Sequence, residues 1–148
     1  GLLMAGAVIQ LEARELDRAL TVLAERLLGL EPVLAEIGEI VLAQAQDAFE
    51  AQQGPGGETW EPSRRVLAQG GQTLVDSGQL LASLTSEVMP DAVVVGSAKV
   101  YAAVHQFGGQ AGRGLAVNLP ARPFLPDEDS LDWPEVLDAV QRHLEAGL

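Results

Sequence analysis

The chain has 148 residues with 21 acidic and 9 basic side chains, which gives a formal charge of −12. Its length suits a single domain over residues 1–148. The acidic balance argues against nucleic-acid or anionic-membrane partners, because both require a cationic surface. The absence of cysteine excludes disulfides, thiol catalysis and cysteine-ligated metals, and no apolar run reaches the ~18 residues of a membrane span.

The first predicted elements are a short strand and two amphipathic helices. Apolar and polar side chains alternate over residues 7–12, which indicates a half-buried strand or the lead-in to the first helix. Over residues 13–28, leucines recur at intervals of three and four residues and predict a helix that ends at Gly29. A longer helix is predicted over residues 32–52 from a stripe of apolar side chains, and Pro32 is tolerated in its first turn.

Residues 53–72 are predicted to form a flexible loop, because glycine clusters lie at both of its ends. Trp60 is a large apolar residue in this loop-like stretch. It either anchors the loop on the body of the protein or is an exposed contact residue.

A short helix and a β-hairpin are predicted next. Asp76 or Ser77 can cap the helix, which carries leucines such as Leu80. The β-like runs 85–89 and 92–97 are separated by Pro-Asp and indicate a hairpin. The second run contains three consecutive valines, which are typical of a strand covered on both faces.

The stretch "VYAAVHQFGG" at residues 100–109 is dense in residue types that often carry chemistry. Tyr101 and Phe107 lie at helical spacing, which predicts a short helix that packs an aromatic pair and ends at Gly108 and Gly109. Residues 108–114 are glycine-rich and are predicted to be a second flexible loop.

The C-terminal part is predicted to be extended at first, because prolines interrupt residues 115–126. An amphipathic helix then follows, capped by Ser130 or Asp132. Its apolar face is predicted to comprise Trp133, Val136, Leu137, Val140 and Leu144.

His105 is the strongest catalytic candidate, because histidine titrates near neutral pH. However, no metal-binding histidine pattern and no G-x-S-x-G elbow is present. The acids at 127–129 are typical of a solvated loop, and neither glycine cluster has the lysine of a phosphate loop. The sequence therefore predicts no catalytic, cofactor or metal site, and His105 is interpreted as a cap or a packed ring. The rival hypothesis is a phage-encoded hydrolase, for example a cell-wall-active one, centred on His105.

Five landmarks form an ordered series in the chain. They are "WEP" at 60–62, "LVDSGQLLASL" at 74–84, "VVVGSAKVYAAVHQFGG" at 93–109, "LPARPFLP" at 119–126 and the amphipathic C-terminal helix. Over residues 8–144 this series resembles the phage virion morphogenesis family, the tail-completion proteins of Mu-like phages and prophages. Members often have a lysine-rich stretch after the tryptophan; here only Arg64 and Arg65 remain, which counts against a nucleic-acid role for that loop.

The resemblance implies an α+β fold, with two N-terminal helices and a C-terminal helix packed on a small antiparallel sheet. It also implies a non-enzymatic structural protein of tail completion or head–tail joining. Such a protein acts in the virion, after assembly in the host cytoplasm, as a homo-oligomeric ring with tail-tube and head-completion proteins. A bacterial adaptor without a phage role is a third hypothesis.

The resemblance also implies a set of structural or interface residues. In "ARPFL", Phe124 either forms an interface plug or docks on the core, with Arg122 bonding a carboxylate or carbonyl groups. The full set is Trp60, Asp76, Gly78, Leu80, Tyr101, His105, Phe107, Gly108, Gly109, Arg122, Pro123, Phe124 and Leu125.

Overall fold

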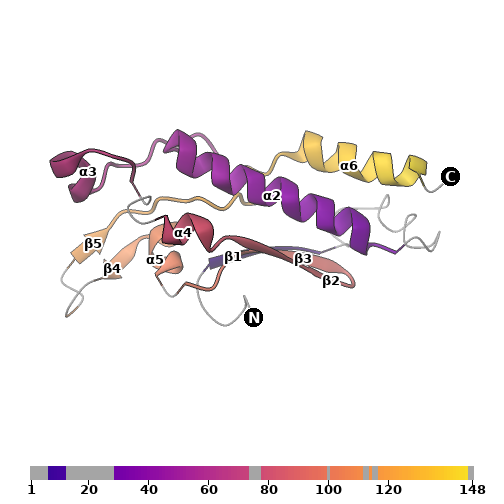
Figure 1. Ribbon diagram of the computed structural model, residues 1–148, viewed down its shortest axis with the longest axis horizontal. Helices are drawn as coiled ribbons and strands as arrows, with labels where there is room; N and C mark the ends of the chain where they lie inside the picture. Colours follow the sequence, from indigo (N-terminus) through magenta and orange to yellow (C-terminus); the bar gives the residue numbers. More distant parts are fainter. Residues whose placement is uncertain are drawn as a thin grey trace.

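The computed structural model describes residues 7–12, 29–73, 78–99, 101–111, 114 and 117–146. The described residues mix helices with two small antiparallel sheets, which confirms the predicted α+β class (Figure 1). The helix predicted at 13–28 lies outside the described residues, as do the proposed capping residues Asp76 and Ser77.

Helix α2, Glu31–Ala51, is the longest described element and confirms the helix predicted over 32–52. Pro32 lies in its first turn, where a missing N–H costs nothing. The helix ends at Gln52, whose backbone is left-handed with φ 59°. One face is buried and consists of Val33, Leu34, Ile37, Gly38, Val41, Ala45, Ala48 and Phe49.

The main sheet has three antiparallel strands in the order β1-β3-β2. They are β1 (Ala7–Glu12), β2 (Thr85–Met89) and β3 (Ala92–Ser97). The strand alternative for 7–12 and the predicted hairpin are therefore both confirmed. All six residues of β3 are buried, because it is the central strand and both of its faces are covered.

Helix α2 lies against β2 and β3 and approaches them closely at Gly38. A Cβ atom at Gly38 would collide with Ser86 Oγ and would lie 2.8 Å from Cγ2 of Val93. Glycine is thus required at this point by the approach of the sheet, although it weakens a helix interior by about 1 kcal/mol relative to alanine.

The segment predicted as a loop at 53–72 contains regular structure. Helix α3, Arg64–Gln69, begins at Ser63, whose Oγ accepts a hydrogen bond from the Val66 N–H at 3.2 Å. Thr73 closes the segment against the end of α2, since its N–H donates to Gln52 Oε1 at 2.6 Å. Residues 64–69 of the stretch predicted as a flexible loop are thus helical, because the serine cap satisfies a first-turn N–H, and the flexibility of the stretch stays a prediction.

Short elements also occupy much of 78–119. Helix α4, Gln79–Ala82, follows Gly78, and helix α5, Ala102–Phe107, confirms the helix predicted in the "VYAAVHQFGG" stretch. In the predicted loop at 108–114, strand β4 (Gly109–Ala111) pairs antiparallel with β5 (Val117–Leu119). Residues 109–111 of the stretch predicted as a flexible loop thus form a strand, because residues 117–119 supply a pairing partner.

Helix α6, Trp133–Ala146, packs against α2, which lies between α6 and the sheet in Figure 1. Asp132 caps it, because its Oδ1 accepts a hydrogen bond from the Glu135 N–H at 3.3 Å. The buried face consists of Val136, Ala139 and Val140. Leu137 was predicted on that face but is 54% exposed.

The substitution Gly38→Ala tests the close approach of α2 to the sheet. Helix propensity alone would stabilise the variant by about 1 kcal/mol. We expect instead that the added methyl group lowers the free energy of unfolding by roughly 1–3 kcal/mol, because it overpacks the contact with β2 and β3. Urea unfolding measures the difference. Glu39→Ala, at an exposed neighbouring position of α2, is the control and should change stability by less than about 0.5 kcal/mol.

Candidate functional site: a clamped segment and an acidic groove

Three aromatic rings from distant parts of the chain form a buried cluster. The Phe49 ring lies 5.5 Å from that of Trp60, edge to face, and 5.3 Å from that of Phe124. Trp60 is 4% exposed and Phe124 is fully buried. Trp60 Nε1 also donates a hydrogen bond to the Pro123 carbonyl at 2.9 Å. Of the alternatives left open by the sequence, the structure places Trp60 as an anchor and Phe124 in the core.

Arg122 is a buried arginine, 4% exposed, that bonds to backbone carbonyl groups. Its Nε donates to the Glu61 carbonyl at 2.7 Å, and its backbone N–H donates to the His105 carbonyl at 2.8 Å. Burial lowers the pKa of its guanidinium, and the negative charge of Glu61 partly opposes this effect. Arg122 thus joins the Trp60 segment to α5.

Gln106 holds the same segment from the other side. Its Oε1 accepts hydrogen bonds from the N–H groups of Phe124 at 3.0 Å and Leu125 at 3.1 Å. Its Nε2 donates to the Leu125 carbonyl at 3.4 Å. A single amide side chain therefore satisfies three backbone groups of an extended segment.

We call residues 122–125, with Trp60, Glu61, His105 and Gln106, the clamp. Sequence reasoning missed Gln106, although it lies in the "VHQFGG" stretch beside the histidine. Glutamine has no distinctive spacing, and its role depends on a segment that is 18 residues further along the chain.

His105 lies in the clamp as a half-buried ring. Its Nδ1 is buried and has no hydrogen-bond partner among the described residues, and the ring packs edge to face on Tyr101 at 6.0 Å. Burial lowers the pKa of His105, and the positive charge of Arg122 lowers it further. A histidine that acts as a general base is commonly oriented by a carboxylate, which also stabilises its protonated form. The charged group that acts on His105 is instead the cation of Arg122.

Phe107 and Gly108 directly follow the clamp residue Gln106 in the chain. Phe107 is 70% exposed, so the prediction that α5 packs it with Tyr101 as an aromatic pair is wrong. Gly108 has φ 76°, and a Cβ there would lie 2.8 Å from the Ala121 backbone nitrogen. The backbone of residues 119–121 passes so close to Gly108 that a larger residue there would collide with it.

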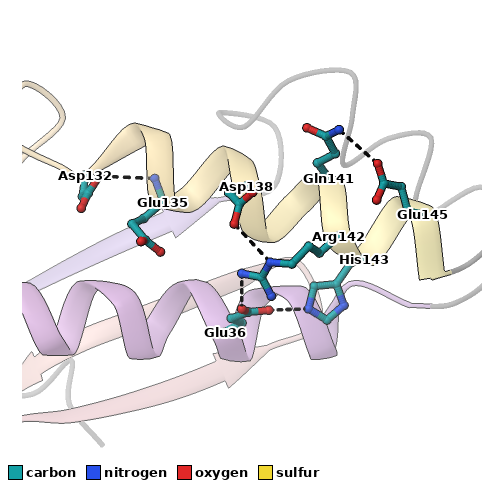
Figure 2. Close-up of polar contacts among 8 residues, drawn as sticks. All are labelled: Glu36, Asp132, Glu135, Asp138, Gln141, Arg142, His143 and Glu145. Atoms are coloured by element: carbon teal, nitrogen blue, oxygen red, sulfur yellow. Dashed lines mark hydrogen bonds and ion pairs between the residues drawn. The ribbon is translucent and has the colours of Figure 1, made fainter.

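Figure 2 shows a second polar cluster, which links α6 to α2. Arg142 Nη2 lies 2.6 Å from Glu36 Oε1, and His143 Nε2 lies 2.7 Å from Glu36 Oε2. The hydrogen bond from Arg142, together with that from His143, lowers the pKa of Glu36. Sequence reasoning missed this histidine–carboxylate pair, because 107 residues separate its members. Both carboxylate oxygens of Glu36 are occupied, which fits a link between helices.

A groove of about 850 Å³ lies beside the clamp. Its apolar lining includes Phe107, Leu125 and Trp133, and the charged residues among the described ones that line it are all acidic. The lining residues are Ile9, Pro55, Gly56, Glu58, Gln106, Phe107, Pro123, Leu125, Pro126, Asp127, Glu128, Asp129, Ser130 and Trp133.

The remaining predicted residues lie in the clamp, in β4 and in or beside α4. Pro123 and Leu125 belong to the clamp, and Gly109 begins β4. Leu80 is buried in α4, next to Gly78 with φ 71°. Asp76 lies outside the described residues.

The described residues thus define an α+β protein whose distinctive motifs hold extended segments together. The model of the phage virion morphogenesis family matches residues 11–145, and the chain belongs to this family. It is 34% identical over 136 residues to "Mu-like prophage FluMu G protein 2" of Haemophilus influenzae, which covers 90% of this chain and 91% of that protein. It is 32% identical over 118 residues to "Putative capsid assembly protein G" of Escherichia phage Mu, which covers 73% of this chain and 75% of that protein. No solved structure matches it.

Replacing Trp60 by phenylalanine tests the anchoring hydrogen bond of the clamp. Trp60→Phe keeps a ring in the aromatic cluster but leaves the Pro123 carbonyl without this donor. We expect the free energy of unfolding to fall by about 1–3 kcal/mol. Trp133→Phe is the matched control, because Trp133 Nε1 donates to the Glu128 carbonyl in an exposed setting. Equal losses in chemical denaturation of the two variants would contradict the anchoring role.

Acidification tests the environment of His105. Its pKa in the folded protein is below the ordinary value of about 6.5, so the unfolded chain binds this proton more readily. The contribution of neutral His105 to stability is complete above that ordinary value and is lost as the pH falls towards the folded pKa. Wild type should therefore lose stability over this interval relative to His105→Gln, as measured by urea unfolding at several pH values. If the free energies of unfolding of the two proteins changed equally with pH, the lowered pKa of His105 would be contradicted.

Proposed function

We propose that this chain is a non-enzymatic structural protein that completes the phage tail or joins it to the head. Its membership of the phage virion morphogenesis family, which supports a structural role in assembly, carries the proposal. The clamp is consistent with it, because the family-like motifs around Trp60, His105 and Phe124 are used for packing and backbone hydrogen bonds.

The hydrolase hypothesis has less support from the site. His105 is half-buried beside Arg122, and the other histidine is bonded to Glu36 in the cluster between helices. Among the described residues, no group of three or more histidine and acidic side chains is arranged to hold a metal ion. A catalyst would need a nucleophile or activated water aligned with a base, and neither histidine is recorded in such an arrangement.

We further propose that the protein acts as a homo-oligomeric ring in contact with other tail or neck proteins. Ring subunits meet through two different surfaces of the same chain. Helix α3 and the β4–β5 ribbon lie at one end of the molecule, away from the contact between α2 and α6 (Figure 1). In this role the protein is incorporated into the virion after assembly in the host cytoplasm. No helix in the described part of the chain has the length and apolarity needed to cross a membrane.

The stage of assembly is the finer part of the proposal. One relative is named as a putative capsid assembly protein, which concerns the head. The ordered motifs instead resemble tail-completion proteins. Both stages are structural steps of virion assembly, and they predict different incomplete particles.

Deletion of the gene from its phage or prophage tests the function. We expect filled heads and tails that accumulate separately, and a plasmid copy of the gene should restore infectious particles. Electron microscopy and plaque titre measure the result. Absence of heads would assign the protein to capsid assembly and overturn the tail-completion proposal. A normal titre of complete particles would overturn any essential structural role.

A further inference from the structure

The groove beside the clamp combines apolar side chains with carboxylates. Its acidic residues come from two segments that are far apart in the chain, with Glu58 in one and Asp127, Glu128 and Asp129 in the other. All four are exposed, and the charged residues among the described ones that line the groove are all acidic. An occupant with positive charges near both segments is therefore favoured.

Phe107 gives the same groove an apolar contact point. Its side chain is 70% exposed, although phenylalanine is a large apolar residue. Exposed aromatic residues beside a hollow are typical of protein interfaces, where they contribute much of the binding free energy. The groove therefore fits an occupant that brings both an apolar side chain and positive charge.

The acidic loop is hydrogen-bonded at two points to residues that line the groove. The Oγ and the N–H of Ser130 each donate to Asp127 Oδ1 at 2.9 Å, and these bonds lower the pKa of Asp127. Trp133 Nε1 donates to the Glu128 carbonyl at 2.8 Å. Bonds that exist before binding reduce the ordering that an occupant must impose on the loop.

The charge of the chain favours a different protein over a second copy as the occupant. A second copy carries a formal charge of −12, so like charges oppose its approach to this groove. A metal ion is a poorer fit than a peptide, because no group of three or more acidic or histidine side chains among the described residues is arranged to hold one. Nucleic acid brings further negative charge.

We propose that the groove binds a basic segment of another virion protein, with an apolar side chain of that segment against Phe107 and its cationic side chains facing the carboxylates. This inference rests on the proposed function. It concerns a contact with a different protein and not the contact between copies in the proposed ring.

Peptide binding to the purified protein tests the chemistry of the groove. The probe is a fluorescein-labelled peptide, KRLLRK, and fluorescence polarisation measures its Kd. The peptide KRSSRK keeps the charge without the apolar side chains, and EDLLDE reverses the charge. We expect KRLLRK to bind at least about tenfold more tightly than either of them. Equal binding of KRLLRK and KRSSRK would overturn the inference, because it would show only a general attraction to an acidic protein.

Variants of the groove locate the binding site. Glu128→Lys with Asp129→Lys should raise the Kd of KRLLRK about tenfold, and Phe107→Ser should do the same. Glu39→Lys with Asp47→Lys changes the net charge equally at exposed positions of α2 outside the groove lining, and should leave the Kd within about twofold in about 0.15 M salt. Urea unfolding checks that each variant is folded. Equal weakening by the two lysine pairs would overturn the assignment to the groove.

Photo-cross-linking in assembled particles tests the partner. A plasmid copy of the gene supplies the deleted phage with a chain that has benzoylphenylalanine in place of Phe107, and a second chain has it in place of the exposed Glu128. We expect mass spectrometry to find both joined to a segment of another virion protein that contains arginine or lysine beside apolar residues. The same group in place of Leu137, which is exposed on α6, is the control and should not give this product.

A product joined to a second copy of this chain or to an acidic segment would overturn the inference, as would a yield equal to that of the control. If gene deletion gives separate heads and tails while the cross-links find no basic segment, the proposed function stands and the inference fails. If gene deletion leaves virion assembly normal while KRLLRK still binds in the groove, the assignment of the groove stands and the proposed function fails.

Discussion

The close approach of α2 to the sheet at Gly38 is the constraint on which the rest of the fold depends. Because no side chain intervenes there, α2 lies directly on β2 and β3 and buries Val93 and Val95 of the central strand. The same helix carries Phe49 at its far end, so its position also places the aromatic cluster. Its N-terminal half holds α6 through Glu36. The helix α2 thus contacts the sheet, the aromatic cluster of the clamp and α6, and its position determines where they lie relative to one another.

The clamp shows how residues that usually suggest catalysis can serve packing. The side chains of Trp60, Arg122 and Gln106 form hydrogen bonds with backbone carbonyl and N–H groups of segments that lie outside the described strands. Buried backbone groups need such partners, because an unsatisfied one costs about 1–3 kcal/mol. A small protein with 4% aromatic residues concentrates its rings where these segments cross. The interior of this region is therefore packed and hydrogen-bonded, and exposed residues surround the groove beside it.

A packed clamp with exposed residues around the neighbouring groove is consistent with a protein of the phage virion morphogenesis family. An assembly protein recognises its neighbours with surface residues, and a rigid support lowers the entropy cost of association. Here Phe107 is exposed and lines the groove, and the next residue, Gly108, lies close to the backbone of Ala121. The acidic loop at 127–129 is held in place by Ser130, whose Oγ and N–H both bond to Asp127.

Local sequence determined those features that depend on neighbours in the chain. Periodicity and caps were sufficient for α2, the β2–β3 hairpin and α6, since each satisfies its own backbone or pairs across a short turn. The α+β class and the family followed from the order of the motifs. Only the tertiary structure decided that Gln106 binds residues 124–125, that Glu36 pairs with His143 and that Gly109–Ala111 forms a strand. It also decided that Phe107 is exposed while Phe124 is buried. The partners of Gln106 and Glu36 lie 18 and 107 residues away in the chain, and no local pattern records which distant segment will supply them.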